Sequence, residues 1–171
     1  GDDTILGGSG DDTIFGGLGS DVAVFNGPTA AYQFSVSPDG RLILAGTDGT
    51  DTLDGVETLR FTDGGIQVSK DDVTGLYTLT GGANVDTITI DPMSVDAFTI
   101  EGGSQSDTLT GGLGDDTIIG GSGDDTIFGG GGTDTAEFNG PTAAYQFSVS
   151  PDGRLILSGT DGIDTLDGVE T

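Results

Sequence analysis

The chain has 171 residues, with 34 glycines, 29 acidic residues and only four lysines or arginines, so its formal net charge is −25. Because it has no cysteine and no histidine, disulfides, Cys/His zinc sites and catalytic triads that need either residue are excluded. No apolar run approaches the roughly 18 residues of a membrane-spanning helix, and so negative a chain is not expected to bind nucleic acid directly.

A nine-residue pattern, Gly-Gly-x-Gly-x-Asp-x-U-x with U a large aliphatic residue, dominates the chain from its start. A partial copy at residues 1–6 is followed by copies at 7–15 and 16–24, and four uninterrupted copies fill residues 102–137. Glycines at the first, second and fourth places permit positive φ, so the chain can turn tightly with carbonyls directed inward. The residues after each Asp favour a short strand. Two nonapeptides therefore predict one coil of turn, strand, turn and strand, with the U residues inside.

The residues after the first group of nonapeptides predict a β-hairpin. Residues 32–36 alternate like a half-buried strand, Pro38-Asp39-Gly40 is a turn signal, and residues 42–44 form a second strand. Residues 46–54 then recover the nonapeptide register, with Asp51 in the sixth place. We expect this segment, up to Phe61, to cover the open end of the coil, because an uncovered strand edge invites association.

Residues 68–101 are less regular but keep a coil-like rhythm. Leu79 aligns with Ile100, and Asp86 with Asp107, at an offset of 21, which predicts a degenerate coil with three extra residues. Gln105 replaces a fourth-place glycine and Pro92 lies in an irregular turn, which puts the metal sites beside these two residues in question.

A longer repeat overlies the short one, because residues 1–58 return as residues 114–171. The copies differ only at Leu6/Ile119, Leu18/Gly131, Ser20/Thr133, Val22/Thr135, Val24/Glu137, Ala45/Ser158 and Thr50/Ile163. The period is thus 113 residues, and near-identity at this length suggests a tandem array. The chain starts within a repeat and without Met, so we expect it to be part of a longer protein. An engineered duplication is the alternative.

The sixth-place aspartates are the expected metal ligands, because all-oxygen ligation by carboxylates and carbonyls suits Ca²⁺ better than zinc or copper. With 18 residues per coil, Asp107 should face Asp125, Asp116 should face Asp134, and Asp3 should face Asp21. Further expected pairs are Asp86 with Asp107, Asp96 with Asp116, Asp12 with Asp51, and Asp125 with Asp164.

The complete set of expected carboxylate ligands is Asp3, Asp12, Asp21, Asp51, Asp86, Asp96, Asp107, Asp116, Asp125, Asp134 and Asp164. Backbone carbonyls are expected to assist near Gly8, Gly10, Gly17, Gly19, Gly103, Gly112, Gly114, Gly121, Gly123, Gly130 and Gly132. The fifth-place acids Asp2, Asp11, Asp115 and Asp124 are either further ligands or solvated charges.

This register resembles the RTX (haemolysin-type calcium-binding) repeats of proteins exported by the type I route. The resemblance implies a parallel β-roll that folds on several calcium ions outside the cell. The expected fold is all-β, an elongated calcium-bound solenoid with β-hairpin caps. We expect the first, partial roll at 1–25, a hairpin cap at 26–68, degenerate coils at 69–101, the second roll at 102–137 and a truncated cap at 138–171.

The expected function is that of a calcium-binding structural repeat module in a long exported surface or matrix protein, such as an adhesin, a filament or an S-layer-like coat. The alternative is the calcium-dependent secretion and folding region of an exported toxin or hydrolase whose catalytic domain lies elsewhere. No catalytic role is expected, because the register already accounts for the carboxylates. The expected location is the outside or surface of a bacterial cell. The expected partner is another copy, in a filament or array, and the sequence identifies no specific ligand.

Overall fold

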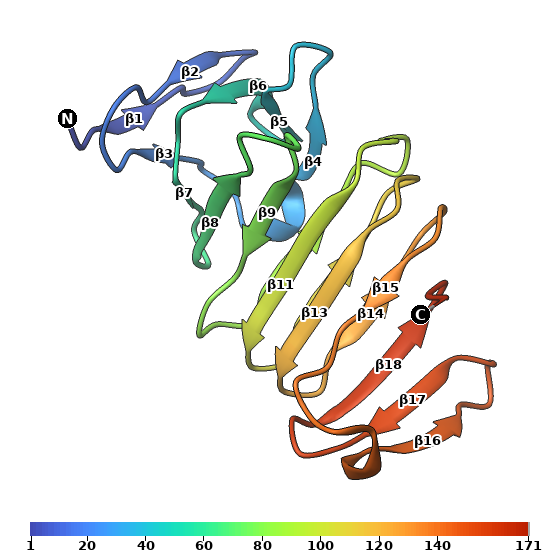
Figure 1. Ribbon diagram of the computed structural model, residues 1–171. Coiled ribbons are helices and arrows are strands. Elements are labelled where there is room, and N and C mark those ends of the chain that lie inside the picture. The colour runs from blue at the N-terminus through green and yellow to red at the C-terminus, as the bar shows by residue number, and fades with distance from the viewer. Residues whose placement is uncertain (171) are drawn as a thin grey trace.

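The computed structural model describes residues 1–170 as three β-sheets made of short strands (Figure 1). The eight-stranded sheet has the order β1 (Thr4–Leu6), β3 (Val22–Val24), β7 (Thr58–Arg60), β8 (Gly65–Lys70), β9 (Tyr77–Thr80), β11 (Phe98–Ser104), β13 (Thr117–Ser122) and β15 (Thr135–Ala136). The six-stranded sheet has the order β10 (Thr87–Thr89), β12 (Thr108–Thr110), β14 (Thr126–Phe128), β18 (Ile163–Asp167), β17 (Leu155–Ser158) and β16 (Gln146–Val149). The four-stranded sheet has the order β2 (Thr13–Phe15), β6 (Gly49–Asp54), β5 (Leu42–Gly46) and β4 (Gln33–Val36).

The helical segments are two single 3₁₀ turns, η1 (Thr29–Ala31) and η2 (Thr142–Ala144). Neither turn, nor any other segment of residues 1–170, forms a helix long and apolar enough to cross a membrane. The all-β class predicted by the glycine-rich register is therefore confirmed, and the last residue of the predicted second cap, Thr171, lies outside the described residues.

The strands of the second roll pair in parallel with the strands one coil later. Ile100 pairs with Ile118 between β11 and β13, and Leu109 pairs with Ile127 between β12 and β14, both at the predicted offset of 18. All four side chains are fully buried. The U column is thus the core between the two sheets, because alternate residues of each strand point inward.

The less regular stretch forms a coil that is three residues longer, as predicted. Leu79 pairs with Ile100 and Ile88 pairs with Leu109, both at an offset of 21. The extra residues lie in the turns, so the strands keep the register of the neighbouring coils.

The predicted hairpin is confirmed as the antiparallel pair β4–β5, in which Phe34 lies opposite Leu44. Strand β6 continues this sheet and then pairs in parallel with β2, with Leu53 beside Ile14. The expected boundary between residues 68 and 69 falls inside β8, which runs antiparallel between β7 and β9.

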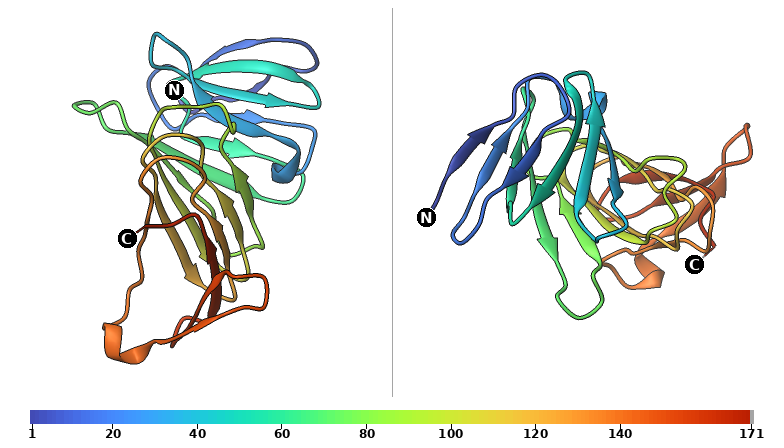
Figure 2. Two further views of the ribbon diagram at one scale, coloured as in Figure 1. Left: turned by 90° about the vertical axis from the view of Figure 1, so that its right-hand side faces the viewer. Right: turned by 90° about the horizontal axis from the view of Figure 1, so that it is seen from above.

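The first hairpin also connects the two rolls. Phe34 of β4 forms a parallel bridge with Ile90, next to β10, and the Asp91 N–H donates to the Phe34 carbonyl at 2.8 Å. The Tyr77 hydroxyl and the Lys70 ammonium group both donate to the Gly40 carbonyl of the hairpin turn. Through this bridge the four- and six-stranded sheets form one layer opposite the eight-stranded sheet. The two termini lie toward opposite ends of the molecule (Figure 2).

Gln105 is the non-glycine residue with positive φ, at 85°, within the described part of the chain. It holds a fourth place that is glycine in the regular nonapeptides, and its carbonyl lies 2.0 Å from the point that a Cβ at Gly123 would occupy. The stacking of coils therefore imposes the left-handed conformation on Gln105, and a residue with a Cβ adopts it at a cost of about 1 kcal/mol.

Gln105→Gly should consequently stabilise the folded chain by about 1 kcal/mol, which corresponds to a rise in Tm of roughly 2–4 °C. Thermal unfolding at saturating calcium measures the change. Gln105→Ala is the matched control, because it shortens the side chain but keeps the Cβ. An equal rise for both variants would mean that the backbone at this position is not strained.

Candidate metal centre

Buried carboxylates stand at the start of the strands, where the glycine turns end. The sixth-place aspartates Asp21, Asp51, Asp86, Asp107, Asp116, Asp125, Asp134 and Asp164 are each at most 3% exposed. Their burial follows from the register, since each lies two residues before a U side chain of the core and shares its face of the strand.

The carboxylates of the six-stranded sheet form a column consisting of Asp86, Asp107, Asp125 and Asp164, here called the Asp86 column. The Oδ1 atoms of Asp107, Asp125 and Asp164 each accept the backbone N–H of the aspartate one coil earlier. The N···O distances are 2.7 Å for Asp86 to Asp107, 2.8 Å for Asp107 to Asp125 and 3.0 Å for Asp125 to Asp164. The structure therefore brings together all three pairs predicted here.

A second column, here called the Asp116 column, runs along the eight-stranded sheet. It contains the predicted pair Asp116 and Asp134, joined by an N–H···Oδ1 bond of 2.9 Å. The predicted pairing of Asp96 with Asp116 is wrong, because Phe98 takes the place opposite Asp116 and donates its N–H to Oδ1 at 2.8 Å. Asp96 lies two residues before Phe98 in the chain and is exposed. The irregular turn after β10 therefore places it out of register with Asp116.

The first copy repeats both arrangements. The Asp3 N–H donates to Asp21 Oδ1 at 2.7 Å, and the Asp12 N–H donates to Asp51 Oδ1 at 2.9 Å, as the pairing predicts. The Asp21 N–H in turn donates to Glu57 Oε2 at 2.8 Å.

Glu57 and its counterpart Glu170 were not among the predicted site residues. Glu170 Oε2 accepts the Asp134 N–H at 2.8 Å, so both glutamates end a column. The signal was present in Glu57-Thr58-Leu59, which matches the Asp-Thr-U end of a nonapeptide with Glu in place of Asp. It was obscured because no Gly-Gly-x-Gly turn precedes it.

The second oxygen of several column carboxylates has no donor. Oδ2 of Asp12, Asp21, Asp107, Asp125 and Asp134 is buried without a hydrogen-bond partner, as is Oδ1 of Asp48 and Asp161. A buried carboxylate oxygen without a donor is costly unless a cation compensates it. The residues therefore fit a metal ion, and their all-oxygen chemistry fits Ca²⁺.

Carbonyl oxygens converge on the same places as these carboxylates. Beside Gly102, the point that a Cβ would occupy lies 2.4 Å from Asp107 Oδ2 and 2.6 Å from the Gly120 carbonyl of the next coil. No three acidic side chains gather at one point within residues 1–170. Carbonyls would accordingly complete the ligand set of any calcium bound between paired carboxylates.

The predicted carbonyl positions lie in tight contact with the following coil. The carbonyls of Gly10, Gly103, Gly112, Gly114 and Gly123 lie 1.8–2.4 Å from the Cβ positions of the glycines stacked against them. Positive φ is present at Gly8, Gly10, Gly17, Gly19, Gly103, Gly121, Gly123, Gly130 and Gly132. Gly112 and Gly114 are not in this region, although their places in the nonapeptide are the same.

The turns therefore have two forms, which differ in whether a glycine N–H donates to Oδ2 of the aspartate. The Gly112 N–H donates to Asp116 Oδ2, and the Gly82 N–H donates to Asp86 Oδ2, both at 2.9 Å. The turns in which the second glycine has positive φ leave Oδ2 of Asp107 and Asp125 without a donor. The carboxylates of the second form are the better candidates for a direct metal bond.

The fifth-place acids have a role that the sequence did not suggest. Oδ1 of Asp2, Asp11, Asp115 and Asp124 accepts the N–H of Ser20, Thr50, Thr133 and Ile163, respectively, at 2.8–3.0 Å. These exposed side chains tie each turn to the turn of the next coil.

Burial changes the proton affinity of the columns. Burial raises the pKa of Asp107 to about 6 and that of Asp164 to about 6, although backbone N–H donors oppose the shift and neighbouring carboxylates add to it. Burial likewise raises the pKa of Asp51, Asp86, Asp116, Asp125 and Asp134. Without a cation, the fold thus favours protonated carboxyl groups.

In the presence of a chelator, acidification should therefore favour the folded chain. The folded-state pKa of Asp107 and Asp164 lies above the unfolded value, so their contribution to stability is complete below about pH 4 and is lost as the pH rises through about 6. Circular dichroism in chelator should show more β structure at pH 5 than at pH 7.5. The Asp107→Asn, Asp164→Asn double variant should weaken this dependence, and a β signal independent of pH in the unmodified chain would contradict it.

Comparisons with known proteins agree with the register. The model of the RTX calcium-binding nonapeptide repeat matches residues 1–23 and 101–136, in four copies. No curated protein sequence matches the chain.

Among solved structures, the crystal structure of the extracellular lipase LipA from Serratia marcescens matches with 18% identity and a TM-score of 0.35, over 99% of this chain and 37% of the lipase chain. This chain thus spans little more than a third of the lipase, and a TM-score this low links the two only loosely. Over residues 1–23 and 101–136, the chain is built from RTX calcium-binding nonapeptide repeats.

Proposed function

We propose that the chain is a calcium-binding structural module of a long, exported, repetitive surface or matrix protein, and that it folds on Ca²⁺ outside the cell. Its partners would be further copies of the same unit, in a filament or array. We propose no catalytic role.

The observation that carries the proposal is the continuity of the eight-stranded sheet through both copies of the 113-residue repeat. Strands β1, β3, β7, β8, β9 and β11 lie within the first 113 residues, and the same sheet continues into β13 and β15 of the second copy. A module that stacks on its own repeat in this way can be extended at its end by further units, as in other solenoid proteins.

The need for calcium follows from charge and burial. The net charge of −25 opposes compaction through self-repulsion, and the buried carboxylates concentrate that charge along the columns. Calcium that binds only the folded chain would neutralise this negative charge. The free energy of calcium binding would then add to the free energy of folding. Extracellular calcium modules bind at about 10⁻⁴ to 10⁻³ M, so the chain would stay unfolded in the cytosol. An unfolded chain suits type I export, which the nonapeptide repeats suggest for a bacterial protein.

A calcium titration followed by circular dichroism and sedimentation velocity tests the proposal. We expect a cooperative gain of β structure at roughly 10⁻⁴ to 10⁻³ M Ca²⁺, with no equivalent change in Mg²⁺. Calcium-dependent association of the folded chains would support an array, and strictly monomeric folded chains would favour the secretion region of a toxin or hydrolase. Full β structure in chelator at pH 7.5 would contradict calcium-linked folding.

Substitution of a column carboxylate should weaken this response at one site. Asp125→Asn removes a buried charge whose Oδ2 has no donor, so the calcium midpoint should rise by roughly tenfold. Asp39→Asn is the matched control, because Asp39 is exposed beside Arg41 in the hairpin turn. If both variants shift the midpoint equally, the columns are not the calcium sites.

A further inference from the structure

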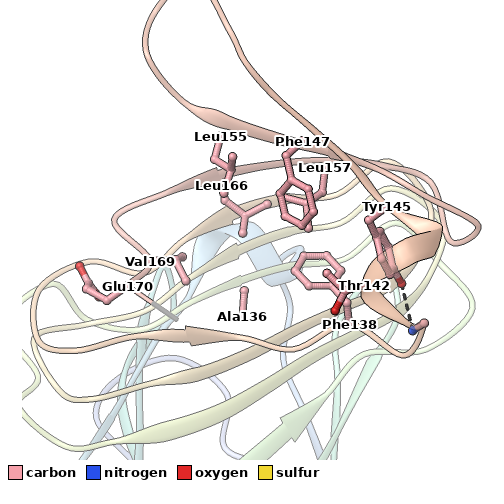
Figure 3. A pocket seen from close by; sticks show the side chains of 11 residues that line it. Ala136, Phe138, Thr142, Tyr145, Phe147, Leu155, Leu157, Leu166, Val169 and Glu170 are labelled. Atoms are coloured by element: carbon pink, nitrogen blue, oxygen red, sulfur yellow. Dashed lines mark hydrogen bonds between the residues drawn. The ribbon is translucent and has the colours of Figure 1, made fainter.

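The second hairpin has an apolar hollow of about 310 Å³ on one side (Figure 3). Phe138, Tyr145, Phe147 and Leu155 line it, and Phe147 and Leu155 are 58% and 39% exposed. Val149, on the same strand as Phe147, is 68% exposed. Phe147 and Val149 lie in β16, the last strand of the six-stranded sheet, and Leu155 lies in the neighbouring strand β17.

In the first copy the corresponding aromatic and leucine residues are buried. Phe34 and Leu42, the counterparts of Phe147 and Leu155, are 0% and 2% exposed. All the residues that line the hollow are identical to their counterparts, since none of the seven differences between the copies falls among them. The difference in exposure therefore comes from the neighbouring segment, not from the surface itself.

The segment that covers the first copy does so through an aromatic ring and a carboxylate. The Phe61 ring lies 5.2 Å from Phe25 and 5.1 Å from Tyr32, between centroids. The Asp63 carboxylate accepts the N–H of Thr29 at 2.9 Å and its hydroxyl at 3.0 Å. In the second copy, Phe138 and Tyr145 retain their mutual contact at 5.5 Å, while Thr142, the counterpart of the buried Thr29, is exposed.

Backbone pairing covers both sheet edges of the first copy as well. Strand β7 pairs with β3, and the Ile90 bridge extends the edge of β4. The counterpart of β4 is β16, which is the last strand of the six-stranded sheet. A free strand edge offers N–H and C=O groups that only another backbone can satisfy in register.

We propose that the hollow and the edge of β16 bind a segment with the sequence of residues 59–113, as the first hairpin already does within this chain. The counterpart of Phe61 would pack against both Phe138 and Tyr145, and the counterpart of Asp63 would bind Thr142. This inference rests on the proposed function, because it states how one unit of the array joins the next. A second copy of the chain could supply the segment only by exchange, since its own residues 59–113 are already packed within it.

The test appends residues 59–113 after Thr171, which continues the 113-residue period, and compares two substitutions at saturating calcium. In the unmodified chain, Phe34→Ser should lower Tm by roughly 10 °C, while Phe147→Ser should leave it almost unchanged. In the extended chain, Phe147→Ser should become as costly as Phe34→Ser. Hydrogen exchange should show that those amides of residues 146–149 that point away from β17 become protected on extension.

Phe61→Ser in the appended segment alone is the control, and it should restore fast exchange at residues 146–149. If Phe147→Ser remains neutral in the extended chain, or these amides stay unprotected, the segment does not dock and the inference is wrong. If the unextended chain dimerises, Phe147→Ser abolishes the dimer and extension has no effect, the hollow binds a second copy of the chain instead. The calcium titration of the unextended chain separately tests the proposed function, so failure of one does not imply failure of the other.

Discussion

The structure depends on carboxylates that are stacked one coil apart and buried at the turns. Each carboxylate after the first of a column uses one oxygen to accept a backbone N–H of the previous coil, so the column aligns the coils. Several of them leave the other oxygen buried without a donor. The same residues thus set the register and accumulate negative charge. A cation bound between the coils would compensate this charge, and the fold would then depend on the cation concentration of the surrounding solution.

The glycines matter because the coils approach one another closely. Carbonyls of one coil lie so near the glycines of the next that a Cβ would overlap them. Stacked glycines therefore serve two needs, since they allow the turn and they admit the neighbouring carbonyl. Gln105, which replaces a fourth-place glycine in the first nonapeptide of the second roll, adopts a positive φ at this position.

The nine-residue register predicted what depends on local periodicity. It located the buried U column and the pairs Asp107–Asp125 and Asp12–Asp51, whereas strand alternation and the Pro38-Asp39-Gly40 turn signal located the hairpin. It failed where an insertion changed the phase, so Phe98 rather than Asp96 faces Asp116. It also missed Glu57, whose turn lacks the glycines, and the bridge between Phe34 and Ile90, because residues 56 positions apart meet through packing that no short period encodes.

The internal duplication shows which structural features follow from the local sequence and which depend on the neighbouring segment. Phe34 and Phe147 have the same local sequence and the same strand, yet one is fully buried and the other is mostly exposed. In a solenoid, stability is the sum of units and of the contacts between neighbours. The hairpin is consequently half of an interface whose other half lies in the next coils. The unit that folds cooperatively should then consist of a hairpin and the roll that follows it, so it would not coincide with one 113-residue sequence repeat.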